Sequence, residues 1–299
     1  MSTERTSPRY DDLDLWPTRD AVLAMAEEQV AAAAAVRACT DAIAAAADAA
    51  AERLSAGSGR LIYVGAGTSG RLAVQDGVEL VPTFGWDEDR LVYALAGGMD
   101  ALLASIEGAE DDAGAGEEAI RAAAASTNDV VIGVAASGRT AYTVAAVRAA
   151  AAAGALTIGL ANNLQTPLLD AAAHPIFLDS GPEVIAGSTR MKAGTAQKIA
   201  LNLFSTALMV RLGRVHGSSM VSMRISNRKL RTRAAAMVAA IGCVDAIVAK
   251  RAIERAGDDI KLAVLIAMGA DPTQGIALLD AVGGDLRKAI ANWTDGPNR

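Results

Sequence analysis

Two stretches of the chain combine glycine with hydroxyl-bearing residues in an arrangement that suits phosphate binding. The first, Gly65-Ala-Gly-Thr-Ser-Gly70, follows the apolar run 61–64, and the second, Ala135-Ala-Ser-Gly-Arg-Thr140, follows the apolar run 129–134. Each run predicts a buried strand, and a helical pattern follows each loop, in the first case from Arg71 onward. Unpaired N–H groups and the positive end of a helix dipole would then converge with the hydroxyls. Side by side, the two loops predict one phosphate pocket, whose candidate residues are Gly67, Thr68, Ser69, Ser137, Gly138, Arg139 and Thr140.

Each loop taken alone has other interpretations. The spacing Gly65-x-Gly67-x-x-Gly70 also matches the dinucleotide-binding fingerprint, but the acidic residue expected about 20 residues later is poorly placed. The loop lacks the lysine of a P-loop, and a tight turn without any ligand would use the same glycines. Arg139 is as well explained by a surface position as by a phosphate contact. The presence of two similar loops favours the phosphate hypothesis.

Five short apolar segments alternate with helical patterns and predict a parallel sheet. The strands are expected at 61–64, 91–95, 129–134, 156–160 and 175–178. Strands that alternate with helices form a sheet covered on both faces, which here predicts a doubly wound α/β fold. Ligands bind such sheets at the carboxyl ends of the strands, near the point where the strand order reverses. The loops 65–70, 135–140 and 181–190 are all expected at that edge.

Helical patterns account for most of the remaining sequence. One or two helices capped by Thr18 are expected up to about Leu54. Further helices are expected at 99–106, from the loop 135–140 to Ala153, from about 198 to 212, and at 218–241. Glycine and Asp-Pro breaks then separate three short helices, 243–256, 260–268 and 272–281. The prediction is an N-terminal helical segment (1–54), an α/β domain (55–240) and a small three-helix module (241–299).

The composition is that of a globular protein and limits the partners. Of 299 residues, 52% are hydrophobic, and the formal net charge of −6 argues against nucleic acid as the main partner. Two cysteines are too few for a disulfide framework and predict reduced thiols in the cytoplasm. No segment has the pattern of a membrane span or a signal peptide. The two histidines, His174 and His216, form no metal-binding motif, so no metal or other cofactor is expected.

Several motifs resemble those of a known enzyme family. The resemblance rests on Gly65-Ala-Gly-Thr-Ser-Gly-Arg71, Pro82-Thr-Phe-Gly85, Glu107-Gly-Ala-Glu-Asp-Asp112, Ala135-Ala-Ser-Gly-Arg-Thr140 and Gly187-Ser-Thr-Arg-Met-Lys-Ala-Gly-Thr-Ala-Gln-Lys198. Together these resemble the N-acetylmuramic acid 6-phosphate etherases, which contain a sugar-isomerase-type (SIS) domain related to those of the vertebrate glucokinase regulatory protein. The resemblance covers nearly the whole chain, including Thr3-Glu-Arg5. It implies a five-stranded SIS sheet with flanking helices and a small UBA-like helical domain at the C-terminal end.

The resemblance also implies a reaction and the residues that perform it. The family cleaves the ether between C3 of the sugar and D-lactate by elimination followed by addition of water, in cell-wall amino-sugar recycling. Carried over by motif, Glu110 is the base that takes the C2 proton and Glu79 the acid that protonates the leaving lactate oxygen. The substrate-binding set extends to Glu183, Ser188, Arg190 and Lys192.

A homodimer is expected, with the N-terminal helices and the 198–212 helix near the interface, because alanine-rich and apolar faces there exceed what one sheet layer needs.

Two alternatives from other functional classes share this fold. A non-catalytic sugar-phosphate regulator would need no acid–base pair, so the two glutamates favour the enzyme, and the Arg190-Met-Lys192 run argues against an aldose–ketose isomerase. The chain departs from the usual family pattern at Asp76-Gly-Val-Glu79-Leu-Val, where Asp-Ala-Ser-Glu-Cys-Pro is usual. It departs again at Asn162-Asn-Leu, where Asn-Pro-Asp is usual. These departures bear on substrate detail rather than on the reaction class.

Overall fold

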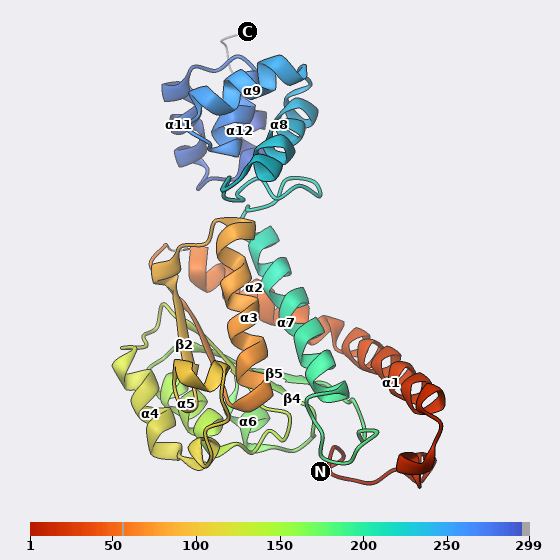
Figure 1. Cartoon of the computed structure of the whole chain (residues 1–299). Coiled ribbons are helices and arrows are strands. Elements are labelled where there is room, and N and C mark those ends of the chain that lie inside the picture. Colours follow the sequence, from red (N-terminus) through yellow and green to blue (C-terminus); the bar gives the residue numbers. More distant parts are fainter. Residues whose placement is uncertain (56, 295–299) are drawn as a thin grey trace. The chain divides into compact units, whose positions relative to one another are not determined.

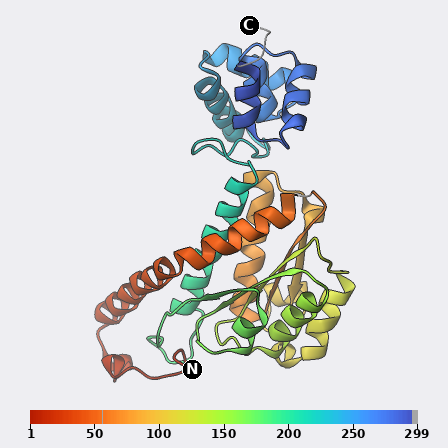
Figure 2. The same cartoon turned by 180° about the vertical axis from the view of Figure 1, so that it is seen from behind.

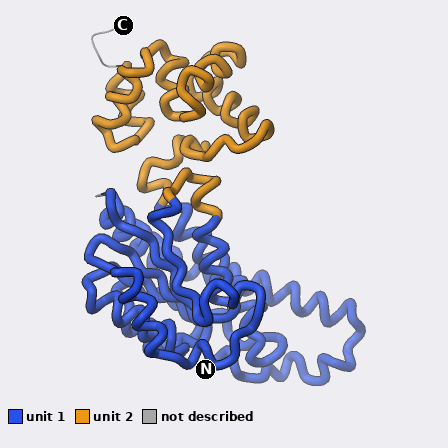
Figure 3. Tube along the Cα trace, turned by 60° about the vertical axis from the view of Figure 1, so that its left-hand side comes forward, with its two compact units in different colours: residues 1–78, 88–208 blue, residues 79–87, 209–299 orange. Residues whose placement is uncertain are grey.

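The computed structural model describes residues 1–55 and 57–294, which form two compact units (Figure 3). The larger unit contains residues 1–78 and 88–208, and the smaller contains residues 79–87 and the chain after 208. The N-terminal helices therefore group with the sheet. The three-domain division at 54/55 and 240/241 stays a prediction.

The sheet at the centre of the larger unit is parallel throughout and has the strand order β2-β1-β3-β4-β5 (Figure 1). Its order reverses between β1 and β3, because the chain proceeds from β1 to one edge and from β3 to the other. Gly65 at the end of β1 is in register with Leu95 and Val134, so three neighbouring strands end at one level. All five predicted strands are confirmed, as β1 (Leu61–Gly65), β2 (Leu91–Leu95), β3 (Val130–Val134), β4 (Leu156–Ala161) and β5 (His174–Phe177).

Helices cover both faces of the sheet, which confirms the doubly wound α/β fold (Figures 1 and 2). On one face α4 (Ala113–Ala122) and α5 (Ala141–Ala152) pack on Ile62, Val64 and Val131, with α6 (Pro167–Ala171) beside α5. Tyr63 alternates with these residues and contacts α3 (Gly67–Phe84) on the other face. There α2 (Thr40–Ser55) packs on β3, β4 and β5, and α7 (Lys192–Arg211) is hydrogen-bonded to α3. Burial on both faces explains why the strands are continuous apolar runs.

The N-terminal region, where one or two helices were expected, forms two, and the first extends away from the sheet. Helix α1 (Thr18–Ala38) ends at Cys39, and both views show it running outward from the sheet layers (Figures 1 and 2). Thr18 is the first helical residue and Pro17 precedes it as the cap, so the predicted capping role of Thr18 is wrong. The side chains of Val22, Leu23 and Val30 are 54%, 50% and 72% exposed.

The helix predicted at 99–106 is wrong beyond its first turn, which is the 3-10 helix Met99–Leu102. The guanidinium of Arg71 donates hydrogen bonds to the carbonyls of Ala101, Leu102 and Ala104, at 3.0, 3.2 and 2.9 Å. An α-helix would need these carbonyls for its own N–H groups four residues later. A side chain from α3 therefore replaces the helical hydrogen bonds.

The smaller unit contains one helical core centred on α10 (Ile260–Ala267). This helix is apolar on nearly all sides, as a helix surrounded by others must be. Helices α9 (Ala246–Arg255) and α11 (Pro272–Ala281) pack around it, and α8 (Arg228–Gly242) and α12 (Leu286–Thr294) share the same core. The prediction that a helix begins at 218 is wrong. Helix α8 begins at Arg228, where the Asn227 side chain accepts a hydrogen bond from Leu230 N and caps it.

Lys261 connects three parts of the smaller unit. Its ammonium donates to the carbonyls of Gly213, just after α7, and Gly284, just after α11, at 2.8 and 2.6 Å. Burial lowers the pKa of this lysine to about 8.

Among the described residues, no single helix is long and apolar enough to cross a membrane, although the bent pairs α1–α2 and α8–α9 pass that test jointly.

A buried carboxyl joins β1, α3 and α7. Asp76 is 4% exposed and accepts hydrogen bonds from Asn202 Nδ2 at 2.7 Å, Tyr63 Oη at 3.0 Å and Ser205 Oγ at 3.0 Å. Burial raises the pKa of Asp76 above the usual aspartate value, and the hydrogen bonds oppose that rise. Because the folded pKa exceeds the unfolded one, the folded state binds more protons between the two values. The contribution of Asp76 to the free energy of unfolding therefore falls as pH rises through that interval.

Asp76→Asn should change how stability depends on pH. Asparagine keeps an acceptor for Asn202 and Ser205 but does not titrate, so the stability of the variant relative to wild type should increase as pH rises above the usual aspartate pKa of about 4. Urea unfolding at several pH values measures this difference, with Asp179→Asn, at an exposed carboxylate, as the control. A difference that is independent of pH, or that shrinks as pH rises, would contradict the assignment.

Candidate functional site

The loop after β1 is shorter than predicted and brings a helix start to the edge of the sheet. Helix α3 begins at Gly67 rather than at Arg71, so Gly67, Thr68 and Ser69 form its first turn. A Cβ on Gly65 would lie 2.7 Å from the Cα of Gly70, which explains both glycines as a close contact between strand and helix. Gly67 has φ +52° and open space around its Cα. As at any helix start, the N–H groups of this first turn have no carbonyl partner within the helix, which is what an anion site requires.

The loop after β3 brings two hydroxyls together at the start of α5. Ser137 Oγ accepts a hydrogen bond from Arg139 N at 3.1 Å and lies 3.5 Å from Thr140 Oγ1. Gly138 has φ +65°, and a Cβ there would lie 2.4 Å from Thr166 Oγ1, so only glycine fits. The Arg139 side chain is exposed and donates to the carbonyl of Gln165 at 3.2 Å. Because β1 and β3 are neighbours at the point of strand reversal, their two loops lie side by side there.

Four of the predicted substrate-binding residues belong to the segment that leads into α7, and two of them are used by the fold. Glu183 is 1% exposed and accepts hydrogen bonds from Lys192 N at 2.9 Å and Ala193 N at 2.8 Å, which caps α7. The buried ammonium of Lys192 pairs with Glu28 of α1. Ser188 is half-buried and Arg190 exposed. The substrate-binding role of all four stays a prediction.

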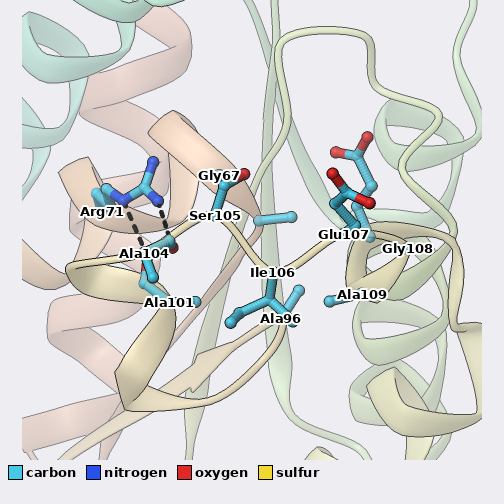
Figure 4. A pocket seen from close by; sticks show the side chains of 12 residues that line it. Gly67, Arg71, Ala96, Ala101, Ala104, Ser105, Ile106, Glu107, Gly108 and Ala109 are labelled. Carbon is cyan, nitrogen blue, oxygen red and sulfur yellow. Dashed lines mark hydrogen bonds between the residues drawn. The ribbon is translucent and has the colours of Figure 1, made fainter.

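A pocket of about 300 Å³ opens where the first turn of α3 faces the segment after β2 (Figure 4). Gly67 and Arg71 line one side and Glu107 lies opposite them. Glu110 also lines the pocket. The pocket thus combines helix N–H groups with two carboxylates. Among residues 1–55 and 57–294, neither carboxylate has a hydrogen-bond partner, so both can interact with a bound molecule.

The other predicted catalytic residue does not line this pocket. Glu79 is an exposed residue of α3, twelve residues after Gly67 and therefore more than three turns along the helix. The sequence pattern began this helix four residues later, at Arg71, and so made Glu79 appear nearer to the helix start. The pairing of Glu79 with Glu110 stays a prediction.

The sequence prediction missed Arg71 and Glu107 as site residues. Arg71 holds the segment 101–104 through three carbonyls, and this segment leads directly to Glu107 and Glu110 (Figure 4). An arginine immediately after a phosphate-binding loop could have indicated such a role, but its partners come from a segment about 30 residues away. Glu107 could have been found from its spacing of three residues from Glu110.

Comparisons with known proteins identify the type of domain that contains this sheet. Residues 42–151 match the family model described as the glucokinase regulatory protein N-terminal SIS domain. The matched part contains β1, β2, β3 and the two glycine–hydroxyl loops after β1 and β3, so the α/β domain is of the SIS type. A solved phosphoheptose isomerase from Francisella tularensis is similar over 66% of this chain and 98% of its own, at 17% identity and a TM-score of 0.48.

Curated relatives are similar over nearly the full length. An N-acetylmuramic acid 6-phosphate etherase from Deinococcus radiodurans is 47% identical over 96% of this chain and 94% of its own. Proteins of the same name from Cutibacterium acnes and Streptomyces coelicolor are each 45% identical over 97% of this chain, and 95% and 94% of theirs. The chain belongs to the N-acetylmuramic acid 6-phosphate etherase family.

Arg71→Lys should loosen the pocket wall without unfolding the protein. A lysine ammonium cannot reach three carbonyls in the arrangement that a guanidinium spans, so amide hydrogen exchange across residues 101–110 should be about tenfold faster. The melting temperature should change little, because the 101–110 segment lies outside the sheet. The exposed Arg121→Lys is the matched control. Unchanged exchange at 101–110 in Arg71→Lys would show that Arg71 does not hold this wall.

Proposed function

We propose that this chain is a lyase that cleaves the D-lactyl ether of N-acetylmuramic acid 6-phosphate, giving N-acetylglucosamine 6-phosphate and D-lactate. Two observations together support this proposal. The chain is similar to etherases over nearly its full length, and Glu110 lines the same pocket as Gly67 in the first turn of α3. Cleavage of this ether needs a base at C2, and Glu110 is an exposed carboxylate at the place where the bound sugar would lie. The product links the reaction to recycling of cell-wall amino sugars.

The binding part of the mechanism uses the two loops at the strand reversal. The 6-phosphate would accept hydrogen bonds from the first-turn N–H groups of α3 and from the hydroxyls of Ser69, Ser137 and Thr140. Phosphate bound there orients the sugar, so that its C2–C3 bond extends toward the Glu107–Glu110 side of the pocket. Arg71 contributes indirectly, since its hydrogen bonds hold the segment before these glutamates.

The chemical part is an elimination followed by a hydration. Glu110 removes the C2 proton, the C3–O bond breaks, and an acid protonates the departing lactate oxygen. Water then adds to C3 of the unsaturated intermediate while a proton returns to C2. The acid role is assigned to Glu79, and each acid–base group should contribute about 10²–10⁴-fold to the rate.

Glu110→Gln should abolish D-lactate release from N-acetylmuramic acid 6-phosphate and stop exchange of the C2 proton with deuterated solvent. Glutamine keeps the size of the side chain but cannot act as a base, so turnover should fall at least 10²–10⁴-fold. Glu117→Gln, at an exposed position of nearby α4, should retain wild-type activity. Full lactate release by Glu110→Gln would exclude this base. A wild-type protein that binds the sugar phosphate and releases no lactate would instead indicate a sensor.

We also propose that the protein is a cytoplasmic homodimer. A second copy would cover the exposed apolar side chains of α1, Val22, Leu23 and Val30, and Leu203 of α7, which is 48% exposed. Both cysteines, Cys39 and Cys243, are free thiols, as is usual in a reducing compartment. The phosphorylated substrate is also expected inside the cell.

A mixing experiment tests whether two copies share a site. Glu79 is exposed beside Val78, an apolar side chain that is 51% exposed, and does not line the pocket that contains Glu110. If each site takes Glu110 from one copy and Glu79 from the other, mixing inactive Glu79→Gln and Glu110→Gln proteins should restore about a quarter of wild-type activity after subunit exchange. Sedimentation analysis establishes the dimer independently. A dimer with no restored activity after exchange would place both glutamates of a site in one copy.

A further inference from the structure

The first residues of the chain are held at the carboxyl edge of the sheet. Thr3 is 0% exposed, although it lies so close to the start of the chain. Figure 1 places the N-terminus beside the segment that leads into α7, and Figure 2 shows the same neighbourhood from behind. Further along this N-terminal segment (residues 1–16), Tyr10 Oη donates a hydrogen bond to Glu28 of α1 at 2.5 Å. The segment is thus fixed at both ends, as a strap across the edge.

Asn163 fixes the start of the strap. Its Oδ1 accepts hydrogen bonds from Ser2 N at 2.7 Å and Ser2 Oγ at 3.1 Å, while its Nδ2 donates to Thr3 Oγ1 at 3.0 Å and Ala136 O at 2.9 Å. Asn163 is 3% exposed, so a lost bond would leave a buried polar atom unpaired. The reverse orientation of the amide would point its N–H₂ group at the N–H of Ser2. The Asn163 amide is therefore hydrogen-bonded both to the strap and to Ala136, in the loop that follows β3.

The strap connects three loops, and two of them carry predicted substrate-binding residues. Through Asn163 it reaches Ala136, which immediately precedes Ser137. The carbonyl of Thr3 accepts a hydrogen bond from Gly187 N at 3.1 Å, and Ser188 follows Gly187 in the chain. The third loop contains Asn163 itself, directly after β4. One buried threonine thus joins the loops after β3 and β4 to the segment that precedes α7.

We propose that Thr3 and Asn163 are positioning residues for the sugar-phosphate site, and that the strap keeps the Ser137 loop in the conformation that binds the 6-phosphate. This inference rests on the proposed function, since it takes the Ser137 loop as part of the phosphate site. Neither Thr3 nor Asn163 touches the substrate in this arrangement. They act through Ala136, whose carbonyl also accepts from Asn162 N at 3.0 Å. The effect of losing the strap should therefore fall on substrate binding more than on the chemical step.

Thr3→Val and Thr3→Ser together test the proposal. Valine keeps the shape of threonine but cannot accept the Asn163 hydrogen bond, whereas serine can. For Thr3→Val, the KM for N-acetylmuramic acid 6-phosphate should rise about tenfold with kcat nearly unchanged. Amide hydrogen exchange at residues 136–140 should become faster, while the melting temperature stays close to wild type. Thr3→Ser should restore the wild-type values, and Thr40→Val, at an exposed threonine of α2, should have no effect.

Three results would overturn the proposal: unchanged KM and unchanged exchange at 136–140 in Thr3→Val, faster exchange spread over the whole larger unit, or no rescue by Thr3→Ser. The failure of the proposed function is a separate outcome. If the wild-type protein releases no D-lactate but Thr3→Val weakens binding of inorganic phosphate about tenfold and speeds exchange only at 136–140, the strap is supported and the lyase assignment fails.

Discussion

The close contact between the end of β1 and the first turn of α3 is the constraint on which the site depends. Gly65 and Gly70 allow backbone to pack directly on backbone, and any side chain at either position would collide with it or with Leu95. The contact brings the helix start to the level at which β1, β2 and β3 end. Arg71 follows one residue later, so the same contact aims its guanidinium at the segment after β2. The first turn of α3 and the pocket wall that carries Glu110 are thus both positioned by this contact.

Polar groups buried elsewhere in the larger unit keep the surrounding helices in place. Asp76 connects β1, α3 and α7 through Tyr63, Asn202 and Ser205, and Glu183 caps α7 with both carboxylate oxygens. A buried polar group costs free energy unless its hydrogen bonds are made, so these contacts allow little variation in how the helices pack. The α7 start lies next to the site as well, since a Cβ on Gly194 would be 3.5 Å from Thr68 Cγ2.

The positions at which the chain departs from its family have structural consequences of their own. Asn163 stands where proline is usual in the resemblance, and here its amide makes hydrogen bonds to the strap and to Ala136. A proline has no side-chain amide and could not make them. The departure therefore concerns how the edge of the sheet is held together, and its effect on the substrate stays a prediction.

The sequence by itself determined the strands, the two glycine–hydroxyl loops at their ends, the family and Glu110 as a candidate base. These features depend on local patterns, because apolar runs, glycine–hydroxyl loops and motif spacing involve neighbouring residues. Only the tertiary structure decided that Arg71 ends the helix expected at 99–106, that Glu183 and Lys192 have partners within the fold, and that Thr3 meets Asn163. It also decided that Glu110, and not Glu79, lines the pocket with Gly67. The reason is that these contacts join residues between 9 and 164 positions apart, and no periodicity along the chain encodes which distant polar groups will meet.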